Sequence, residues 1–484
     1  MDQRANDTIC AVATPPGEGG IGIVRLSGSL ALAIAQQVAL LRSGRSLASV
    51  ASYTLHLADF VDPSVPFKSG APCELEGRPS DRVIDEGLIV FMKGPRSFTG
   101  ENVVEFHCHG GGLVLTRLVD TCLSVGARLA EPGEFTKRAF LNGRLDLTQA
   151  EAVLDTIRAR SEAGLKLAQR HLRGELKELV ARLRNQVVAM LAQVEAGIDF
   201  VEEDISFISR QSLSSGLQNI LDAIHGVLRT AENGRVVREG ARVVIVGQPN
   251  VGKSSLLNRL VGYDRAIVTD IPGTTRDIIE DSVTLDGLLI TLMDTAGLRD
   301  ATDRVEQEGI RRTKAARQEG DLILHVMDAA KLVETEETDI ESLLAYSEKR
   351  TDLHILNKSD LVTEATLHRL TGLLEERASN RVIPISARTG LGLDALKQSI
   401  RSRLSVASLE PPEGALLTNI RHRRALVQAA SSMQEALDAS IRSVDLEFIA
   451  MDLRGATDAL GEITGVITSD EILNQIFSQF CIGK

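Results

Sequence analysis

Eight residues near the middle of the chain constrain its fold more than any others: residues 247–254 read Gly-Gln-Pro-Asn-Val-Gly-Lys-Ser. The apolar run Val243 to Val246 before them predicts a buried strand, and Ser255 to Leu260 after them predicts the start of a helix. Backbone N–H groups at such a helix N-terminus carry partial positive charge and bind phosphate groups. We therefore expect a P-loop, in which Lys253 reaches the outer phosphates of a nucleotide and Ser254 binds Mg²⁺.

A second pair of motifs indicates which base the nucleotide carries. The run Leu353 to Leu356 predicts a strand, and the motif Asn-Lys-Ser-Asp follows it at 357–360. The carboxylate of Asp360 can accept hydrogen bonds from the N1–H and the exocyclic amine of guanine, whereas adenine presents a lone pair at N1. A further strand, predicted over 381–385, ends in Ser-Ala-Arg at 386–388, where backbone N–H groups can meet the guanine O6. These motifs predict GTP rather than ATP.

Two more motifs lie between the P-loop and the base-recognition motif. Residues 273–277 read Gly-Thr-Thr-Arg-Asp and supply a hydroxyl for Mg²⁺ at Thr275, and Asp-Thr-Ala-Gly at 294–297 follows a strand predicted over 288–293. This order of motifs is typical of the translation-factor type of GTPase. The residues that we expect at the nucleotide and its Mg²⁺ are Val251, Gly252, Lys253, Ser254, Ser255, Thr275, Asp294, Thr295, Ala296, Gly297, Asn357, Lys358, Asp360, Ser386, Ala387 and Arg388.

The chain departs from Ras-like enzymes at one position. Where those enzymes carry a glutamine that orients the attacking water, this chain has Leu298, which cannot hydrogen-bond to water. Another group must therefore orient the water. Asp300, Asp303 and Glu306 lie nearby, and each of them also fits a solvated loop charge.

Length and composition limit the number of domains, the cellular location and the kinds of partner that we expect. A chain of 484 residues accommodates three domains of ~150 residues each. No charge-free apolar stretch reaches the ~18 residues of a membrane span, and the N-terminus lacks the pattern of a signal peptide, so we expect a cytoplasmic protein without a membrane span. The net charge of −12 argues against a nucleic-acid surface over the whole chain, although a local basic patch stays possible.

The five cysteines give no sign of a disulfide framework or a zinc site, because they form no Cys-x-x-Cys pair. The run His107-Cys108-His109 could hold a metal, but neighbours in a strand point to opposite faces, which leaves at most the two histidines together. A packed or substrate-facing strand is the favoured interpretation.

The pattern of apolar residues divides the chain into four segments. Residues 1–144 are expected to form an α+β domain, with strands at 21–26, 83–92 and 103–106 and a helix at 114–125. Helical spacing then predicts a first helical segment at 145–240 and a second one at 406–484, on either side of a P-loop G domain at 241–405. We therefore expect a multidomain α/β and α+β protein in which the G domain is inserted into a helical domain.

Four stretches resemble the MnmE (TrmE) family of tRNA modification GTPases, and the likeness covers essentially the whole chain. They are Ala-Thr-Pro-Pro-Gly-Glu-Gly-Gly-Ile-Gly-Ile-Val-Arg at 13–25, Phe-Thr-Gly-Glu at 98–101, Pro-Gly-Glu-Phe-Thr-Lys-Arg-Ala-Phe-Leu-Asn-Gly at 132–143, and Phe-Cys-Ile-Gly-Lys at 480–484. The resemblance implies that the chain acts on tRNA with an FAD-containing partner, MnmG. Together they would install a carboxymethylaminomethyl or aminomethyl group at C5 of the wobble uridine.

The same resemblance implies a tetrahydrofolate derivative, 5-formyl- or methylene-tetrahydrofolate, as the source of the one-carbon unit. The N-terminal domain would bind it and also dimerise, and the implied ligands are Arg25, Glu105, Arg144 and Lys484. From the residues alone, each of the four also fits an ordinary strand-edge, helix-start or terminal charge. Apolar residues near the C-terminus, at 476, 477, 480 and 482, predict that this tail is docked rather than loose.

The resemblance further implies a homodimer in which two G domains meet and K⁺ binds near the phosphates. Glu306 would then orient the attacking water, and Cys481 could act as a nucleophile, although no neighbour in the sequence activates it. We do not expect prenylation of Cys481, because Lys is not among the usual last residues of the prenylation motif. The residues implied around K⁺ are Asn250, Thr269, Asp270, Ile271, Pro272, Gly273 and Thr274, with Asn250, Thr269, Ile271 and Thr274 as its ligands.

Two alternatives remain open at this point. A GTP-dependent ribosome-assembly or translation-type switch would share the GTPase motifs but has no use for a docked Cys-x-Gly-Lys tail. A stand-alone folate-dependent methyltransferase would leave the GTPase motifs without a role. Folate binding tests the first alternative, and dependence of product formation on GTP turnover tests the second.

Overall fold

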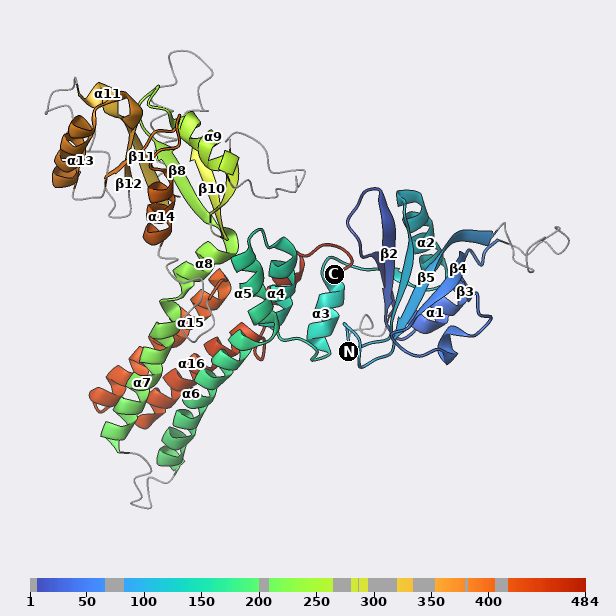
Figure 1. The fold of residues 1–484 in the computed structure, drawn as a ribbon. Helices are drawn as coiled ribbons and strands as arrows, with labels where there is room; N and C mark the ends of the chain where they lie inside the picture. Colours follow the sequence, from blue (N-terminus) through green and yellow to red (C-terminus); the bar gives the residue numbers. More distant parts are fainter. Residues whose placement is uncertain are drawn as a thin grey trace, which may run out of the picture. The chain divides into compact units, whose positions relative to one another are not determined.

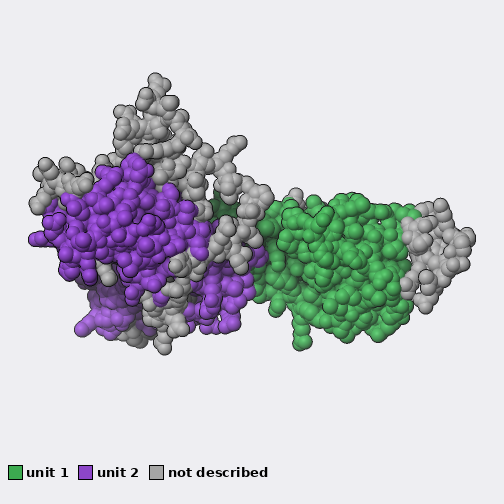
Figure 2. Space-filling view, turned by 45° about the horizontal axis from the view of Figure 1, so that its top comes forward, with its two compact units in different colours: residues 1–154, 464–484 green, residues 155–463 purple. Residues whose placement is uncertain are grey.

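The computed structural model describes residues 7–65, 82–199, 209–263, 280–285, 287–294, 320–333, 353–378, 382–404 and 417–484. The chain divides into two compact units, drawn in green and purple in Figure 2: unit 1 is residues 1–154 with 464–484, and unit 2 is residues 155–463. None of the described helices combines the length and the apolar character that crossing a membrane requires.

Unit 1 is built on a seven-stranded sheet in the order β3-β4-β5-β6-β2-β1-β7, in which only the β1–β7 pair is parallel. Helices α1 (Ala31–Val38) and α2 (Gly112–Ser124) share one apolar core with this sheet (Figure 1). The strands are β1 (Ile9–Val12), β2 (Gly19–Ser27), β3 (Ala39–Leu41), β4 (Leu55–Val61), β5 (Val83–Met92), β6 (Val103–Gly110) and β7 (Arg128–Leu129), and the 3-10 turn η2 spans Leu47–Ser49. The strands and the helix predicted in this region are confirmed, with ends that differ by a few residues.

The C-terminal segment of the chain is part of unit 1. Helix α17 (Asp470–Phe477) packs with α3 (Glu134–Leu141) and with the beginning of α4 (Leu147–Arg158), and the side chains of Phe477 and Phe480 are buried in their common core. Residues 464–484 therefore lie with the N-terminal domain, although helical spacing alone groups them with the helices before them.

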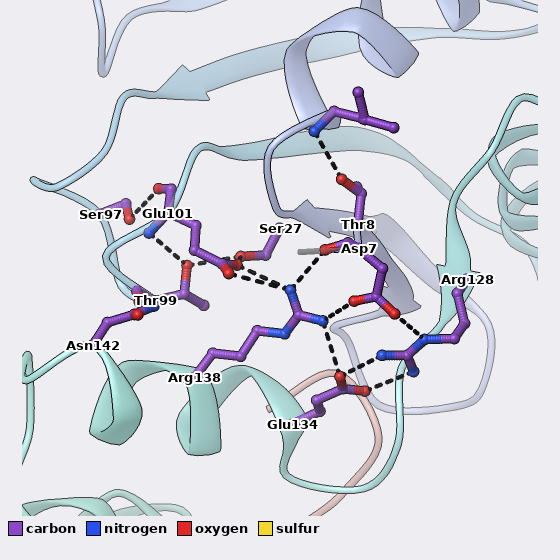
Figure 3. A network of polar contacts seen from close by, with 11 residues as sticks. Asp7, Thr8, Ser27, Ser97, Thr99, Glu101, Arg128, Glu134, Arg138 and Asn142 are labelled. Atoms are coloured by element: carbon purple, nitrogen blue, oxygen red, sulfur yellow. Dashed lines mark hydrogen bonds and ion pairs between the residues drawn. The ribbon is translucent and has the colours of Figure 1, made fainter. Parts of the chain in front are cut away.

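An ionic network centred on the buried residue Arg138 ties the beginning of the described chain to α3 (Figure 3). Arg138 is 7% exposed, and its guanidinium donates to Asp7, to Glu134 at 3.0 Å and to Glu101 at 3.2 Å. Arg128 also binds Asp7, at 2.7 Å, and Glu134, at 2.6 Å. Burial opposes ionisation of Asp7 and Glu134, but the two arginines outweigh it and hold the pKa of both carboxyls below its ordinary value.

Unit 2 contains a helical bundle whose members come from two separate parts of the sequence. Helices α6 and α7 precede the P-loop, α15 and α16 follow the G domain, and all four share one apolar core. The helices are α5 (Glu162–Leu172), α6 (Glu175–Asp199), α7 (Arg210–Leu228), α8 (Ala231–Glu239), α15 (Ile420–Ile441) and α16 (Leu446–Thr464). The G domain is thus inserted into a helical domain, as the sequence predicts.

The G domain has a six-stranded sheet in the order β13-β12-β11-β8-β10-β9, which is parallel except for the pair β9–β10 (Figure 1). Its elements are β8 (Ala241–Val246), α9 (Lys253–Tyr263), β9 (Glu280–Leu285), β10 (Leu288–Asp294), β11 (Leu322–Asp328), α11 (Ala329–Leu332), β12 (Leu353–Asn357), η6 (Ser359–Leu361), α13 (Glu364–Ala378), β13 (Val382–Pro384) and α14 (Leu393–Arg403). Parallel strands bring their carboxyl ends to one edge of the sheet, so the loops after β8, β11 and β12 meet there.

The network around Arg138 gives a first prediction. The substitution Arg138→Met leaves three partly buried carboxylates without their shared cation, and we expect a loss of about 3 kcal/mol in the free energy of unfolding, at the low end of the range for buried ion pairs. Arg128→Met is the matched control: it removes a cation from two of the same carboxylates, but the Arg128 side chain is 36% exposed, so its loss should be smaller. Denaturant unfolding of the full chain measures both, and equal losses would contradict the prediction.

The loss of stability caused by Arg138→Met should be smaller in acid than at neutral pH. Asp7 and Glu134 have folded-state pKa values below their unfolded values, so the stabilisation is present above about pH 4 and is lost as the pH falls further. The difference in unfolding free energy between wild type and Arg138→Met should therefore narrow in acid.

Candidate functional site

The P-loop follows β8 and leads into α9. Gly247 has φ +152°, and a Cβ there would lie 2.3 Å from the Val326 carbonyl oxygen. Gly252 has φ +97°, and a Cβ there would lie 2.3 Å from Nδ2 of Asn357. Both positions therefore require glycine, because the loop runs against the ends of the neighbouring strands.

The lysine of the P-loop lies over the loop itself. Its Nζ donates to the carbonyl oxygens of Gly247 and Gln248, at 2.9 Å each, and the residue is nearly buried. Helix α9 begins at Lys253, so Ser254 and Ser255 stand in its first turn, where N–H groups without intrahelical partners favour an anion. This arrangement suits the phosphates of a nucleotide.

Asn357 joins the P-loop to the loop that follows β13. The residue ends β12 and is buried, and its Nδ2 donates to the Val251 carbonyl oxygen at 2.8 Å. Its Oδ1 accepts from the backbone N–H of Ala387 at 3.0 Å. The residues predicted at the phosphates and those predicted at the guanine O6 are thus linked through one side chain.

Asp360, predicted to recognise the guanine edge, lies in η6 and forms an ion pair with Arg388. The distance from Arg388 Nη2 to Asp360 Oδ2 is 3.3 Å, and the Arg388 side chain is 81% exposed while that of Asp360 is 17% exposed. The sequence predicts a role for Arg388 only through its backbone N–H. The contact between its side chain and Asp360 is a further feature that the structure shows. The carbonyl oxygen of Arg388 also accepts a hydrogen bond from Arg259 at 3.3 Å.

Sequence reasoning missed Asp328, which ends β11 beside Asn357 in the sheet. Its carboxylate accepts from Lys358 Nζ at 2.7 Å. Its position could have been found from the sequence, because Asp328 directly follows the largely apolar run Leu322 to Met327 and so marks another strand end at the same sheet edge.

Several predicted residues fall outside the described part of the chain. Asp294 ends β10, but nothing is described of its side chain. The predicted residues that lie outside the described ranges are Thr269, Asp270, Ile271, Pro272, Gly273, Thr274, Thr275, Thr295, Ala296, Gly297 and Glu306, together with Leu298, Asp300 and Asp303.

A second cluster of predicted residues lies in unit 1. Arg25 on β2 donates to Glu105 on β6, from Nε to Oε1 at 2.8 Å, and from Nη1 to the Gly483 carbonyl oxygen at 3.2 Å. Burial and, second, the charge of Arg25 hold the pKa of the Lys484 ammonium below its ordinary value, while the carboxylate of Glu105 opposes this shift. Three of the four implied folate ligands are therefore neighbours.

The fourth implied ligand, Arg144, makes a different contact. Its Nε donates to the Ser97 carbonyl oxygen at 3.0 Å, which holds the loop that contains Phe98. The Phe98 ring centre is 6.0 Å from the Arg25 guanidinium carbon, and that of Phe135 is 5.6 Å from it. Arg25 thus lies over two aromatic rings, whose faces attract its charge.

The run His107-Cys108-His109 lies in β6. Cys108 is buried in β6, and burial raises its pKa to about 11, whereas His107 Nε2 lies 3.2 Å from Glu105 Oε2. Within the described ranges no group of three or more His, Cys, Asp or Glu side chains is placed to hold a metal ion. The run lies in β6, with Cys108 buried and the His109 side chain exposed, so its residues point to opposite faces of the strand as the sequence predicts.

The C-terminal tail is held closely by its backbone. Gly483 has φ +94°, and a Cβ there would lie 2.1 Å from the Val12 carbonyl oxygen, so only glycine fits. The backbone N–H of Gly133 donates to the Cys481 carbonyl oxygen at 3.5 Å, while the Cys481 side chain is exposed. The predicted docking is confirmed, although Ile482 is 54% exposed and contributes little to it.

Comparisons with known proteins agree with this geometry. A family model described as "MnmE helical domain" matches residues 147–481, and one described as "GTP-binding protein TrmE N-terminus" matches residues 8–144. The curated "tRNA modification GTPase MnmE" of Clostridioides difficile is 42% identical over 479 residues, which cover 99% of each chain. Proteins of the same name from Heliobacterium modesticaldum and Symbiobacterium thermophilum are each 44% identical, again over 99% of both chains. The chain is a GTPase, and it belongs to the MnmE family of tRNA modification GTPases.

Proposed function

We propose that this GTPase acts on tRNA in the cytoplasm, where it works with an FAD-containing MnmG-type partner. Together they add a carboxymethylaminomethyl or aminomethyl group at C5 of the wobble uridine. The observation that carries this proposal is the docked C-terminal tail, which brings Lys484 to the Arg25–Glu105 pair. A protein that served only as a GTP-timed switch would not need this arrangement.

The residues around Arg25 suit a tetrahydrofolate. The cationic groups of Arg25 and Lys484 match the carboxylates of a folate's glutamate tail, and the Glu105 carboxylate can accept from the polar edge of a pterin. Phe98 and Phe135 supply apolar surface beside them. We also propose Arg144 as a folate ligand, as the family resemblance implies. When bound, the 5-formyl- or methylene-tetrahydrofolate would supply the one-carbon unit, and this chain's residues would bind and orient it.

The nucleotide site is proposed to bind GTP with Mg²⁺ and K⁺ and to act in a homodimer. Ser254 and Thr275 would bind Mg²⁺, and Asn250 with Thr269, Ile271 and Thr274 would bind K⁺, whose charge can replace that of an arginine finger. Asn250 has φ +64°, and its carbonyl oxygen is held by Lys358 at 2.9 Å, which supports a fixed P-loop conformation at this residue. Glu306 is proposed to orient the attacking water.

Analysis of wobble nucleosides tests the whole proposal. Cells that lack this protein should accumulate wobble uridine without the C5 group, and the wild-type chain should restore it. Unchanged C5 modification in those cells would refute the proposal and leave the GTPase assignment intact. Restoration by Cys481→Ser as complete as by the wild type would dismiss Cys481 as a nucleophile.

The tail gives a second prediction. Gly483→Ala places a methyl group against the Val12 carbonyl oxygen, so the tail should leave its position, and we expect affinity for 5-formyl-tetrahydrofolate to fall at least about tenfold. Gly126→Ala is the matched control, because Gly126 also has a positive φ, +109°, but has open space around its Cβ position. Calorimetric titration with 5-formyl-tetrahydrofolate measures both variants. Equal affinities for the two would show that the tail does not take part in binding.

A third prediction concerns the monovalent cation. GTP hydrolysis by the wild type should be markedly faster in K⁺ than in Na⁺ at equal ionic strength, and Asn250→Ala should remove most of that difference. The physical reason is that K⁺ would supply positive charge where negative charge develops on the phosphates. Steady-state release of phosphate measures the rates, and equal wild-type rates in the two salts would count against K⁺.

A further inference from the structure

The carboxylate of Asp328 is buried at the end of β11 and has two partners. Only 5% of the residue is exposed. Its Oδ1 accepts from the backbone N–H of Ala330 at 3.0 Å and so caps the short helix α11, and its Oδ2 accepts from Lys358 Nζ at 2.7 Å. A buried carboxylate is tolerated only with such partners, because its transfer from water is costly.

Lys358 extends the contact from this carboxylate to the P-loop. Besides its bond to Asp328, its Nζ donates to the Asn250 carbonyl oxygen at 2.9 Å. One ammonium group therefore bridges the end of β11 and the phosphate-binding loop. The backbone of Lys358 is itself in the left-handed region, at φ +61°, directly after Asn357.

The bridge acts at a strained point of the loop. Asn250 has φ +64°, a conformation that costs a non-glycine residue of order 1 kcal/mol or more. Such a conformation persists only when its surroundings hold it. The charge-assisted bond from Lys358 holds the carbonyl of Asn250, and Asp328 holds the ammonium that makes this bond.

We propose that Asp328 is a positioning residue for guanine-nucleotide binding, which acts through Lys358 to fix the P-loop at Asn250. It does not need to touch the nucleotide. The proposal depends on the GTPase reaction and not on the tRNA chemistry proposed above, so the two can fail separately. The competing interpretation is that Asp328 serves only as the N-cap of α11.

A double-mutant cycle on the full chain separates these interpretations. Asp328→Asn keeps a side-chain oxygen that can cap α11 but removes the negative charge. We expect it to weaken binding of a fluorescent GDP analogue about tenfold, equivalent to about 1.4 kcal/mol, and to speed GDP release. In a Lys358→Met background the same substitution should have no further effect, because the residue through which Asp328 acts is already absent.

Two results would overturn the proposal. One is wild-type GDP affinity in Asp328→Asn together with weakened affinity in Asp328→Ala, which assigns the residue to capping alone. The other is an effect of Asp328→Asn of the same size with and without Lys358. If Asp328→Asn does not fold, Asp328→Ser takes its place, because serine can cap a helix without carrying a charge. Weakened GDP binding in that variant then supports the bridge, and unchanged GDP binding refutes it.

Discussion

The side-chain amide of Asn357 lies between two loops that must act together on one nucleotide, and it bonds to both. Its nitrogen donates to the Val251 carbonyl oxygen of the P-loop, and its oxygen accepts from the N–H of Ala387, in the loop predicted to meet the guanine base. Because the amide is buried, neither bond competes with water, and an unpaired partner would be costly. The loop predicted to bind the phosphates and the loop predicted to recognise guanine are therefore held together by one buried side chain.

In unit 1 the C-terminal tail likewise contacts a residue of the sheet, Arg25. Arg25 is held by Glu105 from the neighbouring strand and by the Gly483 carbonyl from the tail. The tail can approach so closely because Gly483 has no side chain. Arg138 ties α3 to Asp7 and Glu101, and Phe135 of the same helix faces Arg25. The sheet, helix α3 and the tail thus each contribute one contact that positions the Arg25 guanidinium.

The sequence predicts those features that depend on short-range pattern. The run Val243 to Val246 lies within β8, and the predicted helix Ser255 to Leu260 lies within α9, because apolar spacing and glycine positions act locally. The pairs Arg388–Asp360 and Lys358–Asp328 could not be predicted, because each depends on how separate strands align in the sheet. Ile482 was expected to help dock the tail, but the docking comes from Phe477, Phe480 and the backbone.

Calorimetric titration with GDP, ADP and XDP tests the central claim, namely that amide dipoles hold the phosphates while the Asp360 carboxylate selects the base. Xanthine carries a carbonyl where guanine has its exocyclic amine, so an amide at this position can donate to it. The account predicts that the wild type binds GDP and not ADP, and that Asp360→Asn loses GDP affinity by about 100-fold or more and gains XDP binding. Equal binding of ADP by the wild type, or an unchanged preference for GDP in Asp360→Asn, would contradict it.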